Sequence, residues 1–451
     1  MALITVCVIF TAASAAVAQK REKPNPEIYA MVREVSAKNI ENSIRKLVSF
    51  GTRNTLSAQD DPARGVGAAR DWIYGEFQRF SADCGNCLTV EKQTFLQAAN
   101  PPPRGRVPEA TNLTNVVATL KGTTDPGRVY VVSGHYDSIC SSPIDAKCDA
   151  PGANDDASGT AVVIELARVM SKHKFDATIV FMTVPGEEQG LLGSTHFAEQ
   201  AKQKAVNIEG MFTNDIVGGA TTQKDSPNRN RVRVFSEGVP TNETEQQAGT
   251  RRSVGGENDS ASRQLARYIK EQSDKYLRDF KVWMIYRRDR YLRGGDHIPF
   301  LERGFTAVRI TEVDEDFTHQ HQNVRTEDGV FYGDTPEFVD FAYTANVTRV
   351  NLIALASLAS APAPPKNVGI VTRRLTNDTE LKWDAGTDSD LAGYEVVWRD
   401  TTAAEWTNAQ PVGKITNFVV KGLSKDNYFF GVRAVDNNGN KSPVVYPRPM
   451  R

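Results

Sequence analysis

Apolar, β-branched runs that end in polar residues recur between Arg128 and Asp215, and they constrain the fold more than any other feature. Short apolar runs bounded by glycine and proline are typical of buried parallel strands. The carboxyl ends of such strands open on one crevice, so the polar residues that follow them are expected to meet there. The sequence therefore predicts an α/β fold, with a mostly parallel mixed sheet flanked by helices. The runs begin at Val129, Ile179 and Ile208.

The residues that follow these strands carry one imidazole and several carboxylates. They are His135, Glu187, Glu188 and Asp215, and Asp155 would join them from a loop that opens a helix. Bare charges of this kind cannot share a crevice, because repulsion and desolvation would neutralise or expel them. A divalent cation removes that conflict. Nitrogen and oxygen ligands without cysteine indicate zinc or a similar first-row metal, with manganese and cobalt as alternatives.

The length and charge of the chain bear on its domain count and on its partners. A chain of 451 residues is expected to form two or more domains, because single domains cluster near about 100–200 residues. Its 54 basic and 55 acidic residues give a formal net charge of −1. The composition therefore shows no excess of basic residues of the kind that binds nucleic acid. We therefore expect a partner that is small or itself neutral.

The first 18 residues are apolar and rich in small side chains, and they end in Ala16-Val17-Ala18. Such an ending after a short apolar stretch is typical of a cleaved secretory signal peptide, although the usual basic start is missing. The alternative is an uncleaved membrane anchor, but the run is shorter than the about 20 residues that a span needs. We expect a secreted or periplasmic protein with no stable membrane insertion.

Removal of the signal peptide also removes Cys7 and leaves four cysteines. An even number in an exported chain favours two disulfides. Four cysteines allow three pairings, of which the simplest joins Cys84 to Cys87 and Cys140 to Cys148. The second bond would then pin the loop between the first two candidate metal ligands.

Other segments carry patterns that would complete this domain, which we expect to span residues 19–360. Apolar residues recur at helical spacing in several of them, and two further apolar runs predict strands. The polar tract 223–258 has no clear pattern. The expected helices lie within 26–50, 67–80, 159–172, 193–204, 260–276 and 336–360, and the expected strands within 111–120 and 305–311.

The composition changes at residues 361–366, where the proline-rich sequence APAPPK is typical of a linker. Beyond it, short alternating runs between Asp-, Asn- and Gly-rich turns predict a small all-β sandwich at residues 367–451. Trp383, Tyr394 and Tyr428 lie where a fibronectin type III module keeps its core aromatics, and the tail resembles such a module. Because it carries no catalytic pattern, we expect a spacer or adhesion domain.

Several polar segments together allow a comparison with known families, because their order and spacing are far more specific than any one of them. Over roughly residues 110–330 the chain resembles the secreted di-zinc aminopeptidases, the bacterial leucyl aminopeptidase-like zinc exopeptidases. The resemblance implies the zinc exopeptidase fold, two zinc ions per chain and peptide substrates with a free N-terminus. The segments are SGHYDS (133–138), PGANDDASGT (151–160), PGEEQGLLGS (185–194), Asn214-Asp215, GGDHIPF (294–300) and a late histidine.

Carried over residue by residue, the resemblance implies that His135 and Asp215 bind one zinc ion and that Asp155 bridges it to the other. Glu188 and a late histidine would bind the second zinc ion, and Glu187 would be the general base. Two metal ions about 3.5–4 Å apart can polarise a carbonyl and activate a shared water, while a neighbouring carboxylate takes the proton.

The late histidine and the residue that would orient it depart from the family pattern. The family usually has a histidine followed four residues later by an aspartate, whereas here His319 is followed at that distance by Asn323, with His321 between them. We favour His319 on spacing and keep His321 as the alternative. Asn323 can still offer an oxygen to orient a ligating imidazole, and the resemblance implies that Asp137 does so for His135.

The reaction has alternatives that the sequence leaves open. Related enzymes with the same ligands include carboxypeptidases and dipeptidases, and Glu312 is one candidate to hold a free α-amino group. The segment DHIPFLERG (296–304) resembles glutaminyl cyclases, which are single-zinc acyltransferases on the same scaffold. A non-catalytic binding ectodomain is a third alternative, but such proteins tend to lose ligands. We favour a zinc-dependent aminopeptidase and expect it to be a monomer.

Overall fold

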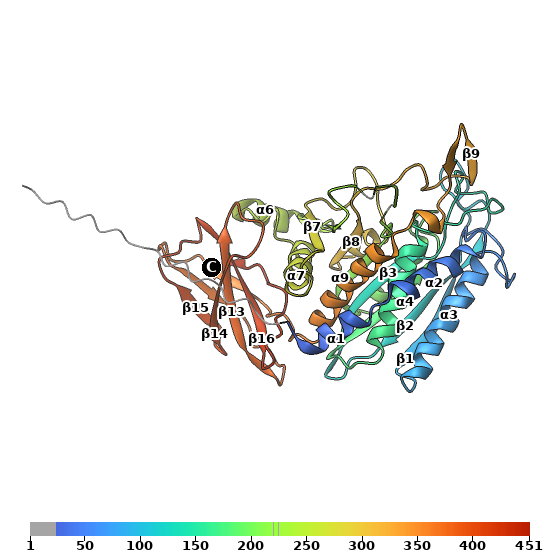
Figure 1. Cartoon of the computed structure of the whole chain (residues 1–451). Helices are drawn as coiled ribbons and strands as arrows, with labels where there is room; N and C mark the ends of the chain where they lie inside the picture. The colour runs from blue at the N-terminus through green and yellow to red at the C-terminus, as the bar shows by residue number, and fades with distance from the viewer. Residues whose placement is uncertain (1–23, 220, 224) are drawn as a thin grey trace, which may run out of the picture.

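The computed structural model describes residues 24–219, 221–223 and 225–451. The expected signal peptide at residues 1–18 lies outside the described part of the chain. Figure 1 shows a larger α/β unit and, beside it, a smaller unit made of strands. No helix within the described ranges is both long and apolar enough to cross a membrane.

An eight-stranded mixed sheet forms the centre of the larger unit, in the order β1-β2-β4-β3-β5-β8-β6-β7. The block β4-β3-β5-β8 is parallel, and β2 and β6 pair with its two sides in the antiparallel direction. The expected α/β fold with a mostly parallel mixed sheet is therefore confirmed. The strands are β1 (Leu88–Gln97), β2 (Thr111–Leu120), β3 (Asp125–His135), β4 (Ala177–Val184), β5 (Asn207–Asn214), β6 (Arg231–Phe235), β7 (Lys281–Ile285) and β8 (Ala307–Glu312).

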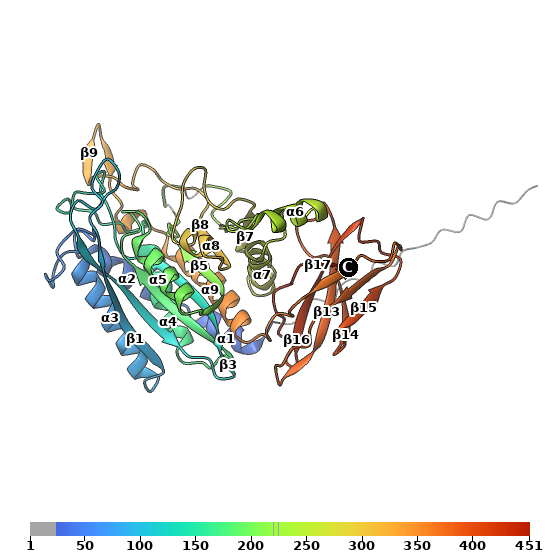
Figure 2. The same ribbon diagram turned by 180° about the vertical axis from the view of Figure 1, so that it is seen from behind.

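Helices cover both faces of this sheet. One face carries α1 to α4, α7 and α9, which share a large apolar core (Figure 1). The other face carries α5 and α8 over a smaller core, as the opposite view shows (Figure 2). The helices are α1 (Pro26–Glu34), α2 (Ala37–Val48), α3 (Val66–Asp83), α4 (Ala157–Met170), α5 (Leu192–Gln203), α6 (Glu245–Val254), α7 (Ala261–Tyr276), α8 (Ile298–Glu302) and α9 (Phe341–Ala359).

The middle of the sheet is apolar along its length because both of its faces are covered. Strand β4 is buried at every position, which explains its continuous apolar run. Helix α4 begins at Asp156, whose Oδ1 accepts a hydrogen bond from the Gly159 amide at 2.9 Å. Its Oδ2 accepts another from the His135 amide at 3.0 Å, so one carboxylate fixes the end of β3 against the start of α4.

Three segments illustrate how the structure differs from the sequence expectations. The helix expected at 26–50 is two helices, because the chain is extended at Val35 and Ser36 caps α2 through the Asn39 amide. The tract 223–258, which carried no pattern, contains β6 and α6. The helix expected at 336–360 begins only at Phe341, after a short 3₁₀ turn, η2 (Pro336–Phe338).

Both disulfides have the simplest of the three possible pairings. Cys84 is bonded to Cys87 at the end of α3, and Cys140 is bonded to Cys148 with a Cα–Cα distance of 6.5 Å. The second bond closes a loop between β3 and α4, as expected. A small hairpin, β9 (Arg325–Glu327) and β10 (Val330–Tyr332), and a 3₁₀ turn, η1 (Thr221–Gln223), complete the larger unit.

The smaller unit is the expected all-β sandwich. A four-stranded sheet has the order β15-β12-β11-β17, and a three-stranded sheet has the order β14-β13-β16. Trp383 and Tyr394 are buried between them with an edge-to-face contact at 5.4 Å, whereas Tyr428 is only half-buried. The strands are β11 (Gly369–Val371), β12 (Thr379–Lys382), β13 (Leu391–Asp400), β14 (Asn408–Gly413), β15 (Asn417–Val420), β16 (Tyr428–Asp436) and β17 (Arg448–Met450).

The sandwich packs directly against α7 rather than projecting from the larger unit (Figures 1 and 2). Arg399 of β13 donates to both oxygens of Asp259 at 2.9 and 2.7 Å, and Arg267 of α7 lies 2.9 Å from the same carboxylate. All three side chains are buried. The junction itself is anchored, because Arg128 donates to the Ala361 carbonyl at 2.7 Å. The sandwich is therefore held against the larger unit by buried contacts, and its role as a spacer or adhesion domain stays a prediction.

Asp259→Ala should destabilise the folded chain. The change leaves Arg267 and Arg399 buried without their carboxylate, and breaking a buried ion pair in this way costs about 3–5 kcal/mol. Urea unfolding followed by tryptophan fluorescence measures the change in the free energy of unfolding. Glu380→Ala, which removes the partly exposed partner of Lys382, is the matched control and should change it by about 1 kcal/mol or less. If the two changes had equal effects, the contact of Asp259 with Arg267 and Arg399 would not be a stabilising buried ion pair.

Candidate metal centre

The candidate ligands converge because their strands are neighbours and parallel. His135 is the last residue of β3, Asp215 follows β5, and Glu187 and Glu188 follow β4 in the loop that leads to α5. Asp155 lies in the loop before α4 and reaches the same edge of the sheet. The structure thus brings together all of the strand-end residues that the sequence singles out, at the carboxyl ends where α/β sheets bind ligands.

Asp155 stands between two groups of possible metal ligands. Its Oδ1 lies 3.1 Å from His135 Nε2, which in turn is 3.9 Å from Asp215 Oδ1. Its Oδ2 lies 2.9 Å from His321 Nε2, which is 2.8 Å from Glu188 Oε1. Within each group of three residues, the ligand atoms all lie within 4.8 Å of one another. We call the groups the first cluster (His135, Asp155, Asp215) and the second cluster (Asp155, Glu188, His321).

Three atoms of these clusters have no hydrogen-bond partner although they are buried. They are His135 Nε2, Glu188 Oε1 and His321 Nε2. Each lies close to a carboxylate or imidazole atom of its cluster, but none of these contacts has hydrogen-bond geometry. Buried polar atoms are normally satisfied, so orphaned nitrogen and oxygen atoms within the two clusters indicate cation-binding sites. The donor set of imidazole and carboxylate fits zinc.

The pKa shifts of the site residues also indicate that the clusters bind cations. Although burial lowers the pKa of His321, the carboxylates of Asp155 and Glu188 raise it to about 11. Burial raises the pKa of Glu187 well above its ordinary value, and the surrounding carboxylates raise it further. The pocket therefore holds more negative charge than its imidazoles can balance. Divalent cations at the two clusters would remove that imbalance.

Asp137 and Glu187 flank the first cluster. Asp137 Oδ1 lies 3.3 Å from His135 Nδ1, and its Oδ2 accepts hydrogen bonds from Thr55 Oγ1 and the Glu188 amide at 3.0 and 3.2 Å. This leaves His135 Nε2 facing Asp155. Glu187 is half-buried, and no described residue donates a hydrogen bond to its carboxylate. The two adjacent glutamates are thus in different settings, since only Glu188 belongs to a cluster.

The structure places His321 and not His319 at the second cluster, which corrects the preference drawn from spacing. The His319 ring stacks on Phe338 with centroids 3.6 Å apart, and its Nε2 is 3.8 Å from Asp316. Between the two histidines, Gln320 donates to Asp155 Oδ2 at 2.8 Å. His321 adopts a left-handed backbone with φ of 55°. His319 therefore faces Phe338 and Asp316, whereas Gln320 and His321 both reach Asp155.

Two further expectations are corrected. Asn323 does not orient His319, because its Oδ1 accepts hydrogen bonds from the amide and hydroxyl of Ser141 at 3.2 and 2.9 Å. Glu312 does not face the clusters, because both of its oxygens accept from Asn154 Nδ2 at 3.0 and 3.1 Å. Glu312 therefore holds the residue before Asp155 and is not placed to bind a substrate amine.

Sequence reasoning missed two charged residues at this site. Asp296 is fully buried, and burial together with Asp137 and Asp215 raises its pKa to about 7, against the effect of His135. Arg309 is fully buried on β8, and its Nη1 lies 2.6 Å from Asp215 Oδ2. Both had a signal in the sequence. Asp296 lies in the GGDHIPF motif, and an arginine inside an apolar strand run needs a buried partner.

Asp334 was missed as well, and no local pattern marks it. Its carboxylate accepts hydrogen bonds from the Asn154 and Asp155 amides at 2.8 Å each. This fixes the loop that carries the shared ligand. Its segment follows the β9–β10 hairpin, so only the folded chain brings it to this loop.

The comparisons with known proteins agree with this centre. The model of "Peptidase family M28" matches residues 115–329, the part of the chain that contains both clusters. The chain belongs to this family. Two fungal relatives are each called "Probable zinc metalloprotease". One, from Leptosphaeria maculans, is 50% identical over 429 residues, which are 95% of this chain and 98% of the relative. The other, from Pyrenophora tritici-repentis, is 49% identical over 430 residues, 95% of this chain and 88% of the relative.

The solved structures agree in fold. The aminopeptidase LapA of Legionella pneumophila has a TM-score of 0.51 at 19% identity, covering 76% of this chain and 78% of its own. The expected zinc exopeptidase scaffold is thereby confirmed, and so is the expected enzyme class, a zinc-dependent peptidase, at the level of the family. The relatives are fungal, whereas the resemblance seen in the sequence is to bacterial enzymes.

Proposed function

We propose that this chain is a two-zinc aminopeptidase that removes N-terminal residues from peptides. One observation carries the proposal: the two carboxylate oxygens of Asp155 face different clusters, each completed by one imidazole and one further carboxylate. A carboxylate in this position can bridge two metal ions. His135 and Asp215 would complete one metal site, and Glu188 and His321 the other.

The side chains around the clusters have different roles in catalysis. A pair of divalent cations supplies Lewis acidity for a peptide carbonyl and makes water more acidic at this site. Glu187 accepts the proton of the attacking water at its unpaired carboxylate and then donates that proton to the leaving amine. Asp137 holds the His135 ring through Nδ1. Arg309 holds one oxygen of Asp215 and leaves the other for the first cluster.

The test is a comparison of blocked peptides with metal analysis of the same sample. A leucyl tripeptide with a free N-terminus should be cleaved, its N-acetylated form should resist cleavage, and its C-terminal amide should be cleaved. Two zinc ions per chain should accompany this activity. Cleavage of the acetylated peptide would favour a carboxypeptidase. One zinc ion together with cyclisation of N-terminal glutamine would favour the glutaminyl cyclase alternative.

His321→Ala should separate the two candidate histidines. Removing a ligand of the second cluster should lower bound zinc from about two ions per chain to about one and should greatly reduce hydrolysis. His319→Ala removes the ring stacked on Phe338, which belongs to neither cluster, and should leave both ions in place. Zinc is measured by elemental analysis after gel filtration. If His319→Ala lost zinc while His321→Ala kept two ions, the ligand assignment would be reversed.

The proposal also states that the protein is secreted and that its C-terminal sandwich belongs to a known type of module. The apolar start that ends in Ala16-Val17-Ala18 and the two disulfides suit an oxidising compartment outside the cell. The tail is a fibronectin type III-like module, supported by its sheets of four and three strands and by the buried pair Trp383 and Tyr394. N-terminal sequencing of the secreted chain tests the signal peptide, with a new N-terminus at Gln19 as the expected result.

A further inference from the structure

The two clusters differ in how firmly the fold holds their ligands. In the first cluster, His135 ends β3 and Asp215 directly follows β5, so both ligands sit on the central sheet. In the second cluster, Glu188 lies in the loop after β4. His321 lies in the long segment between β8 and η2, and its side chain is 38% exposed. The second cluster therefore needs positioning contacts that the sheet does not provide.

The loop closed by Cys140 and Cys148, which we call the disulfide loop, contacts the segment of the first of these ligands. The Pro143 carbonyl accepts a hydrogen bond from Gln189 Nε2 at 2.8 Å. Gln189 directly follows Glu188 and is 5% exposed. The same carbonyl accepts from Asn54 Nδ2 at 3.1 Å, which ties the loop to the segment after α2. The disulfide loop thus anchors the chain on the C-terminal side of Glu188.

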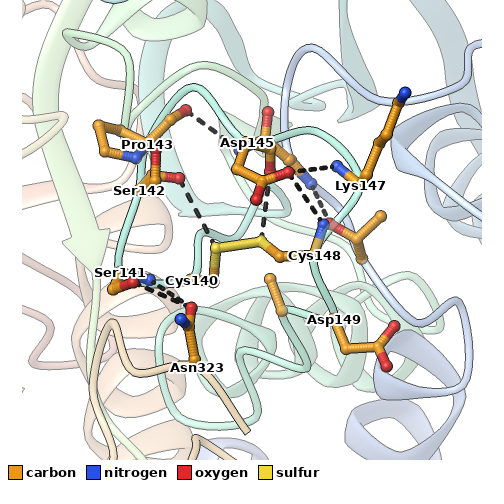
Figure 3. Close-up of a disulfide and its surroundings, with 12 residues drawn as sticks. Cys140, Ser141, Ser142, Pro143, Asp145, Lys147, Cys148, Asp149 and Asn323 are labelled. Atoms are coloured by element: carbon orange, nitrogen blue, oxygen red, sulfur yellow. Dashed lines mark hydrogen bonds between the residues drawn. A yellow bond between two sulfur atoms is a disulfide. The ribbon is translucent and has the colours of Figure 1, made fainter.

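The disulfide loop also contacts the segment of the other ligand. Figure 3 shows Asn323 beside Ser141, the residue after Cys140. Asn323 Oδ1 accepts from the Ser141 amide at 3.2 Å and from its hydroxyl at 2.9 Å. Asn323 is two residues beyond His321. One covalently closed loop therefore contacts both the segment of Glu188 and the segment of His321.

We propose that the disulfide loop is a brace that sets the spacing between Glu188 and His321, and that Asn323 is a positioning residue for His321. The inference rests on the proposed two-zinc function, because it assigns the loop to the second metal site alone. Breaking the disulfide releases the Ser141 and Pro143 contacts together. Loss of such supporting contacts lowers metal affinity about 10- to 100-fold. The first cluster, held by strands, keeps its affinity.

The first test removes the brace. In Cys140→Ser/Cys148→Ser, zinc titration against a chromophoric chelator should show the second equivalent bound about 10- to 100-fold more weakly and the first unchanged. The matched control is Cys84→Ser/Cys87→Ser, which removes the other disulfide at the far end of α3 and should bind both equivalents as the unaltered chain does. Equal weakening in both double variants, or in both equivalents, would overturn the proposal.

The second test leaves both disulfides intact and does not depend on the cysteine variants folding. Asn323→Ala removes the acceptor of the two Ser141 hydrogen bonds and should weaken the second equivalent, whereas Asn323→Asp keeps Oδ1 and should restore it. The absorption spectrum of the cobalt-loaded chain should change for Asn323→Ala only in the band of the second ion. Identical titrations for Ala, Asp and the unaltered chain would overturn the proposal. An unaltered chain that binds no second ion would instead overturn the proposed function.

Discussion

Glu187→Gln is expected to lower the hydrolysis of an N-terminally free peptide about 10²- to 10⁴-fold while the zinc content stays at two ions per chain. The amide keeps the shape of the side chain but cannot accept the proton of the attacking water. It should not disturb the ligands, because Glu187 belongs to neither cluster and its carboxylate receives no hydrogen bond from the described residues. The measurement is kcat together with elemental analysis of the same preparation.

A matched exchange on the neighbouring helix controls for general effects of losing a glutamate. Glu199→Gln on α5 removes an exposed partner of Arg303 and should leave kcat and zinc content unchanged. If Glu187→Gln kept near-normal turnover, the general base would have to be another group. The buried carboxyl of Asp296, which adds to the field at Glu187, would be the next candidate to replace.

Asp155→Ala is expected to abolish hydrolysis and to lower zinc from two ions per chain to less than one. Other ligands belong to a single cluster, but Asp155 belongs to both, so its loss leaves each with one imidazole and one carboxylate. Structural and catalytic zinc sites keep at least three protein ligands. Elemental analysis and peptide hydrolysis measure the result.

Asp83→Ala, which removes an exposed carboxylate at the end of α3, is the control for the loss of an aspartate. It should retain both zinc ions and full activity. An Asp155→Ala chain that still bound two zinc ions tightly would show that this carboxylate does not bridge the sites. Circular dichroism should confirm that the α/β fold survives, because the Asp334 contacts go to backbone amides that the change leaves in place.

The central sheet and most of the site could be predicted from the sequence because their determinants are local. An apolar run that is buried on both faces marks a parallel strand, and its end marks the crevice, so His135, Glu188 and Asp215 could be placed before any coordinates were known. The disulfide pairing was open in principle. The simplest pairing forms because each bond joins cysteines that are close in sequence, at separations of 3 and 8 residues.

The remaining features of the site depend on three-dimensional geometry, which the spacing of residues along the sequence does not determine. Whether His319 or His321 faces the carboxylates depends on the backbone path of this segment, in which His321 is left-handed and Gln320 donates to Asp155. The pairing of Arg309 with Asp215 joins a residue of β8 to the residue that follows the adjacent strand β5, 94 positions away in sequence. Sequence reasoning can mark a buried arginine as unusual, but it cannot name the carboxylate that receives it.

The buried contact of Asp259 with Arg267 and Arg399 couples the evolution of the two units. Asp259 belongs to one unit and Arg399 to the other, and both are buried where they meet. A recombination event that exchanged the tail for an unrelated sandwich would remove Arg399 and leave Asp259 paired with Arg267 alone. We therefore expect lineages that keep Asp259 to keep Arg399 as well, so that the two units are inherited together.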